Sequence, residues 1–372
     1  MEAILFPGTF GTQAWLSPPA AIPFGKWDRC REILEKGGVK MFARRHSRVK
    51  GWVLFWGVVI LISSAAMPGL AADYPDKPIT IYLGFPPGGA GGISAQIFAD
   101  CAKKYLPRPQ PIMLNYKPGA AHALAADYVL KQPADGYSLY WLLPDLMVKL
   151  AKDAKSLSFT REDFVPIGIL GESPCAITVR KDSPYRSLQD FVEDAKKNPG
   201  KIAYASSGIG SFTHMVAEVF QMRAGLTLNQ IPFAGAAQVT TAVLGGHVSS
   251  WIGGSIAANG AHIRPGGGLR VLTVFAKERW PEFPDIPTCT ESGYNIENSV
   301  WYALAVPKAT PPSVIDILQK VFKKTADDPQ VKETLIQTAY KPLNLSMEES
   351  EKKVKEDFEV AREIFKKLGL AQ

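Results

Sequence analysis

A glycine-rich turn between an apolar strand and a helix recurs along this chain, and its first copy is Phe85-Pro86-Pro87-Gly88-Gly89. The apolar run 79–83 before it predicts a strand, and the run 93–105 after it predicts a helix. The start of a helix leaves backbone N–H groups without partners, and the helix dipole adds partial positive charge there. Such a turn suits a carboxylate or a phosphate. The alternative is an ordinary connection that holds no ligand.

Three further loops repeat the order of strand, small residues and helix start, at 117–122, 206–213 and 234–237. The first two loops of the set belong to a βαβαβ pattern, which predicts a parallel sheet with right-handed crossovers. The last two follow the strands of a second unit. Ligands of open α/β sheets bind beyond the carboxyl ends of the strands. The pattern therefore predicts two α/β lobes that grip an anion in the cleft between them.

Two long apolar strands are expected to connect the lobes. The run 167–179 carries the chain into the second lobe, and the run 300–306 carries it back. We expect lobe 1 to comprise 73–172 plus 298–372, and lobe 2 to comprise 173–297. Within lobe 2, Ser187 is a plausible N-cap for a helix over 187–198.

The C-terminal segment carries one apolar stripe at helical spacing, formed by Val354, Phe358, Ala361, Phe365 and Leu368. Charged residues occupy the opposite side of this helix. We expect the stripe to pack on lobe 1. The alternative is a helix that lies on a membrane surface.

The N-terminal region reads as a leader rather than as part of the fold. Arg44, Arg45, Arg48 and Lys50 precede the apolar run 52–66, and small residues follow it. This order is typical of a secretory signal peptide, so 41–72 is expected to be cleaved off and the protein to be periplasmic. An uncleaved anchor is the alternative, although the run is short for a membrane span. Residues 1–40 are expected to be an over-extension upstream of a true start at Met41, and to be disordered.

Composition excludes several classes of protein. The net charge of +7 comes mostly from residues 1–72, which hold nine Lys and Arg against four Asp and Glu. The other 300 residues hold 33 against 31, and no nucleic-acid motif is present, so no nucleic-acid partner is expected. Cys101, Cys175 and Cys289 remain after the leader and are expected as buried thiols, with one bridge as the alternative. The histidines are not spaced as metal ligands are, so no metal is expected. No cofactor is expected either.

From Tyr74 almost to its end the chain resembles the solute receptors of the tripartite tricarboxylate transporter system, also called the Bug family. No single motif is specific, but the order of about a dozen is. They are Tyr74-Pro75-Asp76-Lys77-Pro78-Ile79, Phe85-Pro86-Pro87-Gly88-Gly89, Asn115-Tyr116-Lys117-Pro118-Gly119-Ala120, Ala134-Asp135-Gly136-Tyr137, Asp163-Phe164-Val165-Pro166, Pro199-Gly200-Lys201, Gly208-Ile209-Gly210-Ser211 with His214, Gly225-Leu226, Ile231-Pro232-Phe233, Gly245-Gly246 and Pro287-Thr288.

The resemblance implies a two-lobed periplasmic binding protein fold of type II, in which each lobe is a mostly parallel sheet flanked by helices. It implies a small organic anion as ligand, such as a di- or tricarboxylate or an aromatic acid, and permease subunits as membrane partners. We expect a monomer without catalytic residues. The ligand-binding residues that the resemblance implies are Phe85, Pro87, Gly88, Gly89, Ala120, Ala121, His122, Ser206, Ser207, Gly208, Ser211, Phe212, Thr213, Phe233, Ala234 and Gly235.

The chain departs from the family at three places. Gly92 stands where the family commonly has Asp, Gln96 stands where it has Arg, and Ala121-His122 replace a second glycine pair. His122 either supplies a polar contact or is simply exposed. Trp251 and Trp301 either form an aromatic wall of the cleft or pack in the core.

Two other functions remain open from the sequence. An exported hydrolase would use Ser206, Ser207, Ser211 or Ser255 as nucleophile with His214 as base. However, Gly253-Gly254-Ser255-Ile256-Ala257 misses the nucleophile-elbow pattern at its last residue, and Ser255 is expected to lie outside the cleft. A sensory partner of a kinase would differ from a transport receptor only in its docking surface.

Overall fold

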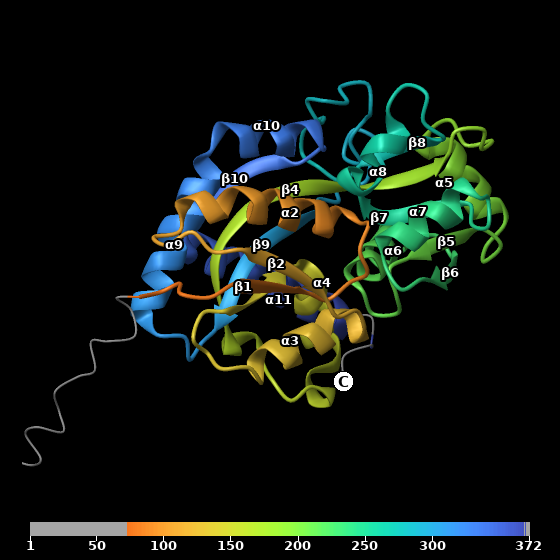
Figure 1. Ribbon diagram of the computed structural model, residues 1–372. Coiled ribbons are helices and arrows are strands. Elements are labelled where there is room, and N and C mark those ends of the chain that lie inside the picture. Colours follow the sequence, from red (N-terminus) through yellow and green to blue (C-terminus); the bar gives the residue numbers. More distant parts are fainter. Residues whose placement is uncertain (1–72, 368, 370–372) are drawn as a thin grey trace, which may run out of the picture. The chain divides into compact units, whose positions relative to one another are not determined.

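A computed structural model describes residues 73–367 and Gly369. The predicted leader, residues 1–40 and Leu368 lie outside the described residues. The described strands form two sheets that share one long strand, β4 (Phe164–Arg180), and helices cover both sheets (Figure 1).

The first sheet begins with the βαβαβ order that the sequence predicts. Its strand order is β2 (Ile112–Tyr116), β1 (Ile79–Leu83), β3 (Ser138–Leu142), β9 (Ser299–Pro307) and β4, with β10 (Lys341–Leu345) paired to β4. β1 is parallel to β2 and β3, whereas β9 is antiparallel to β3 and β4. The carboxyl ends of the three parallel strands therefore meet at one edge.

The second sheet repeats this plan on a smaller scale. Its strands are β4, β7 (Ser250–Ser255), β5 (Ala203–Ser206), β6 (Asn229–Pro232) and β8 (Leu269–Val274), the last paired to β4. β5 is parallel to both β6 and β7. β4 pairs with β9 up to Pro174 and with β7 from Cys175, so one continuous strand joins the two sheets. The lobe boundaries at 172/173 and 297/298 stay a prediction.

Alternation along the strands assigns side chains to the two faces of each sheet. In β1, Ile79, Ile81 and Leu83 join one hydrophobic cluster, and Tyr82 joins another on the opposite face. Successive side chains of a strand point to opposite faces, so both faces of the sheet are buried. Helices cover them. They are α2 (Ala90–Ala102), α3 (Ala123–Leu130), α4 (Pro144–Asp153), α9 (Pro312–Asp327), α10 (Pro329–Gln337) and α11 (Met347–Lys367) around the first sheet, and α5 (Leu188–Lys197), α6 (Phe212–Ala224), α7 (Ala236–Leu244) and α8 (Ile256–Ile263) around the second.

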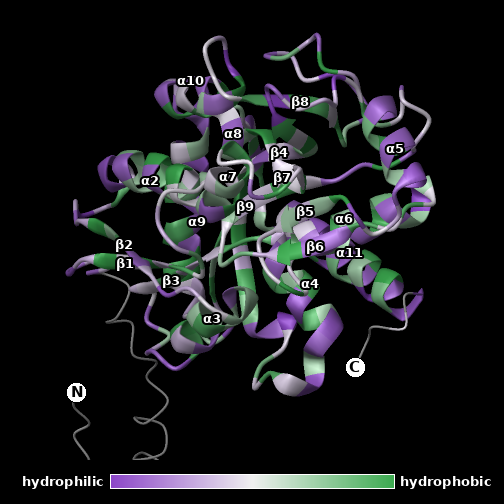
Figure 2. Cartoon of the chain, turned by 90° about the vertical axis from the view of Figure 1, so that its right-hand side faces the viewer, coloured by the Kyte–Doolittle hydropathy of each residue, from purple (hydrophilic) through white to green (hydrophobic). Residues whose placement is uncertain are grey.

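The C-terminal helix packs on the first lobe, as its stripe predicts. Val354, Ala361 and Phe365 of α11 are buried, and α11 contacts α4 and β4. Figure 2 shows hydrophilic and hydrophobic residues alternating around this helix. Among the residues that the structure describes, no helix has both the length and the apolar character needed to cross a bilayer.

Several expectations from the sequence agree with the structure. Cys101, Cys175 and Cys289 are free and buried. Local N-cap chemistry also holds, because the Ser187 side chain accepts a hydrogen bond from the backbone N–H of Asp190 at the start of α5. For Trp301 the core alternative applies, since its buried indole donates a hydrogen bond to Asp357 of α11. Burial raises the pKa of Asp357 above its usual range.

One glycine of β4 tests this packing. A Cβ atom at Gly168 would lie 2.3 Å from the ring of the buried Phe322, which in turn packs against Phe98. We expect Gly168→Ala to lower the free energy of unfolding by about 1–3 kcal/mol, because the ring has no room to move. Gly260→Ala is the matched control: its Cβ would meet only the Thr338 carbonyl oxygen at 3.8 Å, within a helix. Urea unfolding should show the control equal to or more stable than wild type; equal losses in both variants would contradict this packing.

Candidate functional site

A cavity of about 530 Å³ lies between the two sheets, beyond the carboxyl ends of their parallel strands. The loops after β1, β2, β5 and β6 all contribute to its wall, as does the end of β7. These are the loops that the repeated glycine pattern singles out. The predicted residues that line the cavity are Phe85, Gly89, Ala120, Ala121, His122, Ser207, Gly208, Thr213, Phe233, Ala234 and Gly235.

Two helix starts lie close together in the wall of this cavity. α2 begins after Gly89 and α7 begins after Gly235, and neither N-cap residue offers a side-chain hydrogen bond. A Cβ atom at Gly89 would lie 3.5 Å from the Cβ atom of Ala236, and one at Gly235 would lie 3.1 Å from Cδ of Pro86. The two lobes therefore come close together at this point. In the first turns of these helices, the Gly92 N–H donates to the Gly89 carbonyl, whereas the N–H groups of Ala90, Gly91 and Ala236 have no partner within the helices, and these three residues line the cavity.

Two of the other helix starts in the wall, those of α6 and α8, are capped by the protein's own side chains. Ser211 caps α6 by accepting from His214 N–H, and Ser255 caps α8 by accepting from Ala258 N–H. The carboxylate of Asp145, from α4, accepts the Phe212 N–H at 3.1 Å. The donors of the 206–213 loop are thus largely satisfied internally, whereas those of α2 and α7 are not.

Five predicted residues do not line the cavity. Pro87 and Gly88 are exposed and do not belong to the cavity wall. The Ser206 hydroxyl is buried and accepts from Gln230 Nε2 at 2.7 Å, and Ser211 is engaged in the cap of α6. Phe212 faces a different cavity. Which of the sixteen residues contact a ligand stays a prediction.

That second cavity is larger, about 890 Å³, and its lining differs in kind. It is bounded by the exposed segment 276–282, by 297–299 and by α11, and it mixes acidic and basic side chains such as Glu172, Glu297, Lys277 and Lys353. Of the helix starts described above, it receives only Phe212, whose N–H is already bonded. We therefore place the candidate site in the smaller cavity.

Ionisable side chains are scarce in the candidate site. Of the described residues in its wall, none is Lys or Arg, and His122 and Asp145 form its one acid–base pair. Nε2 of His122 lies 4.0 Å from Oδ1 of Asp145. Burial lowers the pKa of His122, and the nearby carboxylate only partly offsets that shift. In the part of the chain that the structure covers, no group of His, Cys, Asp and Glu could hold a metal ion.

His122 is held firmly by its surroundings. Its backbone lies so near Gly84 that a Cβ atom there would be 2.6 Å from the His122 Cα atom. The imidazole packs 5.4 Å from the Phe85 ring, and the Tyr140 hydroxyl donates to the His122 carbonyl at 3.4 Å. Of the two alternatives for His122, exposure does not apply: its side chain is 13% exposed and lines the cavity.

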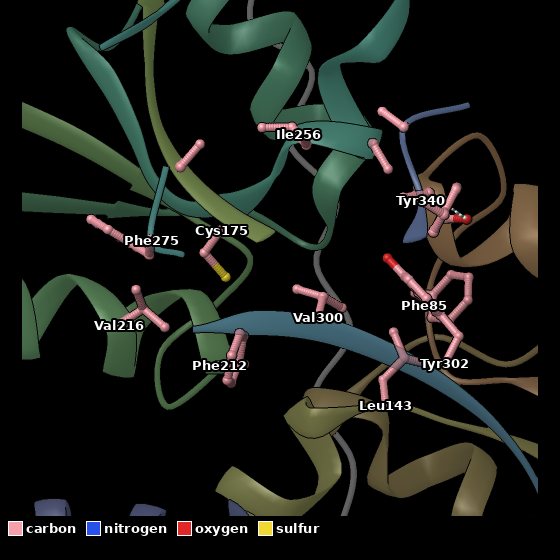
Figure 3. Packing of buried hydrophobic residues seen from close by; sticks show 14 of the residues in the cluster. Phe85, Leu143, Cys175, Phe212, Val216, Ile256, Phe275, Val300, Tyr302 and Tyr340 are labelled. Carbon is pink, nitrogen blue, oxygen red and sulfur yellow. Dashed lines mark hydrogen bonds between the residues drawn. The ribbon is translucent and has the colours of Figure 1, made fainter. Parts of the chain in front are cut away.

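The cavity wall also contains residues that the sequence analysis did not name as ligand contacts. Asp145 follows β3 on a helix whose start, Leu143-Pro144-Asp145, carries the proline and acidic residue typical of a first turn. Trp251 lines the cavity although it is only 2% exposed, so it belongs to both core and wall. The expectation that Ser255 lies outside the cleft is wrong, because β7 extends through Gly253 and Gly254 and delivers Ser255 to the wall. Figure 3 shows Tyr302, another wall residue, beside Phe85 and Leu143.

Comparison with known proteins identifies the group to which this architecture belongs. The family model described as "Tripartite tricarboxylate transporter family receptor" (TctC) matches residues 94–370. The chain belongs to this receptor family. It is 32% identical to protein BugT of Bordetella pertussis over 269 residues, which is 71% of this chain and 81% of BugT.

Solved structures agree with this assignment. The periplasmic binding protein BugD superposes with a TM-score of 0.75 and 28% identity, covering 80% of this chain and 99% of BugD. MatC from Rhodopseudomonas palustris, solved with bound malate, shares the fold with a TM-score of 0.72 and 23% identity, covering 78% of this chain and 99% of MatC. The two-lobed α/β periplasmic binding fold predicted from the sequence is confirmed. The receptor is a solute-binding protein of the periplasmic type.

The departure at Gly92 has a local explanation in this receptor. A Cβ atom at Gly92 would lie 3.2 Å from the Tyr116 hydroxyl, so the tyrosine occupies the space of a larger residue. Gln96, one turn further, is exposed and donates to Asp100 on the same helix. Neither position lines the cavity. The departures that reach the wall are Ala121 and His122.

The backbone of residues 120–122, in the cavity wall, is strained. Ala120, Ala121 and His122 have φ angles of 49°, 48° and 75°, in the left-handed region that side chains disfavour. We expect Ala121→Gly to raise the free energy of unfolding by about 1 kcal/mol, because glycine adopts this conformation without a Cβ clash. Ala123→Gly is the control, since its φ of −64° is right-handed and helical. Thermal unfolding should show opposite signs for the two variants; destabilisation by both would refute the strain.

The buried imidazole predicts a pH effect on stability. The folded-state pKa of His122 is lowered, so the unfolded chain binds more protons below about pH 6.5 and acid favours unfolding. We expect wild type to lose stability relative to His122→Asn as the pH falls from 7.5 to 5, by at most about 1.4 kcal/mol per pH unit. Asparagine tolerates the left-handed backbone and does not titrate. The measurement is the urea midpoint of both proteins across this pH range. Parallel changes in the two midpoints would contradict the prediction.

Proposed function

We propose that this receptor captures a small organic carboxylate between its lobes and delivers it to a membrane permease. The observation that carries the proposal is the pair of helix starts, α2 and α7, which have glycine N-caps without side-chain hydrogen bonds and lie close together in the cavity wall. One carboxylate between them receives N–H donors and two helix dipoles of favourable sign. Because neither helix has a side-chain cap, the ligand completes both ends.

The size and lining of the cavity support a small and largely uncharged site. A volume of about 530 Å³ lies within the usual range for small-molecule sites. The wall is built from small and aromatic residues, without Lys or Arg among its described members. Binding therefore depends on backbone dipoles and on closure around the ligand rather than on a salt bridge. The sequence-predicted residues that line the cavity are the proposed ligand contacts.

The hydroxyl groups in the second lobe support binding without catalysis. Ser211 Oγ accepts from the backbone of His214, while Nδ1 of the His214 ring accepts from Gly210 N–H at 3.0 Å. The ring nitrogen that a general base would use is therefore already engaged, and Nε2 faces Glu218 at 3.6 Å. Ser207 Oγ pairs with Thr213 Oγ1 instead of a histidine. We propose that the receptor has no enzymatic activity.

The same proposal covers the cleavage of the leader and the closure of the two lobes. Cleavage after Ala71 or Ala72, which lie outside the described residues, would release the receptor into the periplasm. Lobes comprising 73–172 plus 298–372 and 173–297 would close about the crossing strands β4 and β9. Ligand binding and permease docking would then share one motion.

The test is a ligand screen on the mature chain, from Asp73 onward. Malate, citrate, adipate and benzoate serve as probes, and thermal unfolding is followed against ligand concentration. A ligand that binds only the folded state stabilises it by about 2.7 kcal/mol at a hundredfold excess over Kd. We expect a concentration-dependent rise in Tm with at least one probe. Tm values unchanged by all four would overturn the carboxylate assignment.

A variant at the helix start locates the binding site. Gly89→Leu places a side chain against Ala236 and over the N–H groups of α2, so we expect the ligand-induced rise in Tm to disappear. The apo protein should keep its Tm, because the φ of −103° at Gly89 suits any residue. Gln96→Leu introduces the same residue at an exposed position further along α2 and should bind as wild type does. Wild-type affinity in Gly89→Leu would show that the anion lies elsewhere.

A further inference from the structure

One buried hydrogen bond joins the helices around the first sheet to those around the second. The carboxylate of Asp145, in the first turn of α4, accepts the backbone N–H of Phe212, the first residue of α6, at 3.1 Å. Away from β4, β9 and the residues next to them, the described residues show one other hydrogen bond of this kind, from the exposed Arg264 to the Gln337 carbonyl. The Asp145 bond is therefore the buried point at which the two lobes are fastened together.

The same face of α4 follows the second lobe for two turns. Asp145, Val148 and Lys152 succeed one another at helical spacing, so they lie on one side of the helix. Val148 belongs to the same hydrophobic cluster as Phe212. A Cβ atom at Gly210 would lie 3.3 Å from Cδ of Lys152. The Asp145 bond is thus one part of a packed contact between α4 and the start of α6.

The segment that Asp145 holds is braced from within. Thr213 Oγ1 accepts the Ser207 N–H at 2.8 Å and lies 2.9 Å from Ser207 Oγ. Ser211 Oγ lies 3.1 Å from the same Thr213 oxygen. These bonds tie the 206–213 loop to the first turn of α6, so the loop and the helix start move together. Because Ser207 and Gly208 line the cavity, the position of α6 sets one side of the site.

The carboxylate itself is fixed in the first lobe. It lies in the first turn of α4, where the helix dipole favours a negative charge. Asp145 is 7% exposed, and its Oδ1 lies 4.0 Å from Nε2 of His122 in the cavity wall. Hydrogen bonds to a charged group are stronger than those between neutral groups, and burial limits competition from water.

We propose that Asp145 is a positioning residue for ligand capture. Its bond to the Phe212 N–H sets the 206–213 loop against the first lobe and favours the conformation in which both lobes bound the cavity. Asp145 acts through the loop rather than through the ligand. The inference rests on the proposed function where it concerns affinity, whereas the arrangement of the lobes can be measured without a ligand.

The effect on affinity follows from the coupling between closure and binding. A ligand that binds only the closed conformation has an apparent Kd equal to its intrinsic Kd divided by the closed fraction. Loss of a bond between the lobes raises the open fraction, so the apparent Kd rises while the ligand's own contacts stay the same. For a hydrogen bond to a charged group, the expected change is roughly tenfold.

Three variants test the carboxylate. Asp145→Ala removes the acceptor. Asp145→Asn keeps an oxygen acceptor of similar position and should lie closer to wild type than Asp145→Ala does. Asp127→Ala is the control, because this carboxylate of α3 accepts from Ser158 at 2.9 Å within the first lobe.

A second pair of variants tests the bond from the other lobe, and it stands even if Asp145→Ala does not fold. Phe212→Pro deletes the donor at the first position of α6, where proline is well accepted, after an extended Ser211. Phe212→Ala loses the same ring but keeps the N–H. A difference between these two variants therefore reports the bond, and it should vanish when Asp145→Ala is added to both.

The first measurement is the distance between spin labels on the ligand-free mature receptor. The labels are placed at Gln96→Cys of α2 and Thr241→Cys of α7, two exposed positions on helices whose starts lie close together. The native cysteines are buried. We expect Asp145→Ala to gain a population at longer distance, and Phe212→Pro to gain more of it than Phe212→Ala. Distributions identical to wild type in Asp145→Ala and equal in the two Phe212 variants would overturn the proposal.

The second measurement is calorimetry with malate, citrate, adipate and benzoate. For each probe that binds wild type, we expect roughly tenfold weaker binding in Asp145→Ala, and the same loss in Phe212→Pro relative to Phe212→Ala. Weaker binding in Asp145→Ala with unchanged label distances and equal affinity in the two Phe212 variants would show a direct ligand contact and overturn the positioning role. If no probe binds wild type, the proposed function fails, and the label distances still decide this inference.

Discussion

Unpaired N–H groups at two helix starts govern the rest of this structure. A helix start exposes several donors, and a folded protein must pair them with side chains, water or a ligand. At α2 and α7 glycine replaces the usual capping residue, and the absence of a side chain lets the two lobes come so close that a Cβ atom at Gly89 would lie 3.5 Å from Cβ of Ala236. A serine at either cap would satisfy one donor and also fill the gap. The small residues thus keep the lobes close together and leave the N–H groups at the helix starts without side-chain partners.

Across the cavity the protein meets the same requirement with its own acid. Asp145 accepts the Phe212 N–H at the start of α6, so an internal carboxylate does for α6 what a ligand would do for α2 and α7. This bond also joins α4 of the first lobe to α6 of the second. Its charge lowers the electrostatic potential of that side of the wall. The same Oδ1 atom lies 4.0 Å from Nε2 of His122, so this one carboxylate links the wall of the cavity to both lobes.

Local patterns in the sequence predict much of this architecture. The strand 79–83, the helix 212–224 and the cap at Ser187 follow from alternation, helical spacing and capping chemistry, all of which act within a few residues. The cavity wall is harder to predict from the sequence. Asp145 accepts a hydrogen bond from Phe212, which is 67 positions away, and only the fold brings the two residues together. The positions of Trp251 and Ser255 were difficult to predict for another reason. Gly253 and Gly254 lie between them, and a glycine pair is typical of a turn, but here it continues β7. Ala120-Ala121-His122 carries no left-handed signal, because alanine favours the right-handed helix.

The strained turn connects stability with recognition. Left-handed backbone costs roughly 1–2 kcal/mol per residue for side chains with a Cβ atom, and three consecutive residues adopt it here. Glycine at these positions would remove the strain, but it would also remove the imidazole from the wall. The burial of His122, its lowered pKa and its unpaired Nδ1 further reduce the stability of the apo receptor. Backbone strain of this kind persists where the surrounding contacts hold it, and here His122 packs against Gly84 and the Phe85 ring in the wall of the cavity.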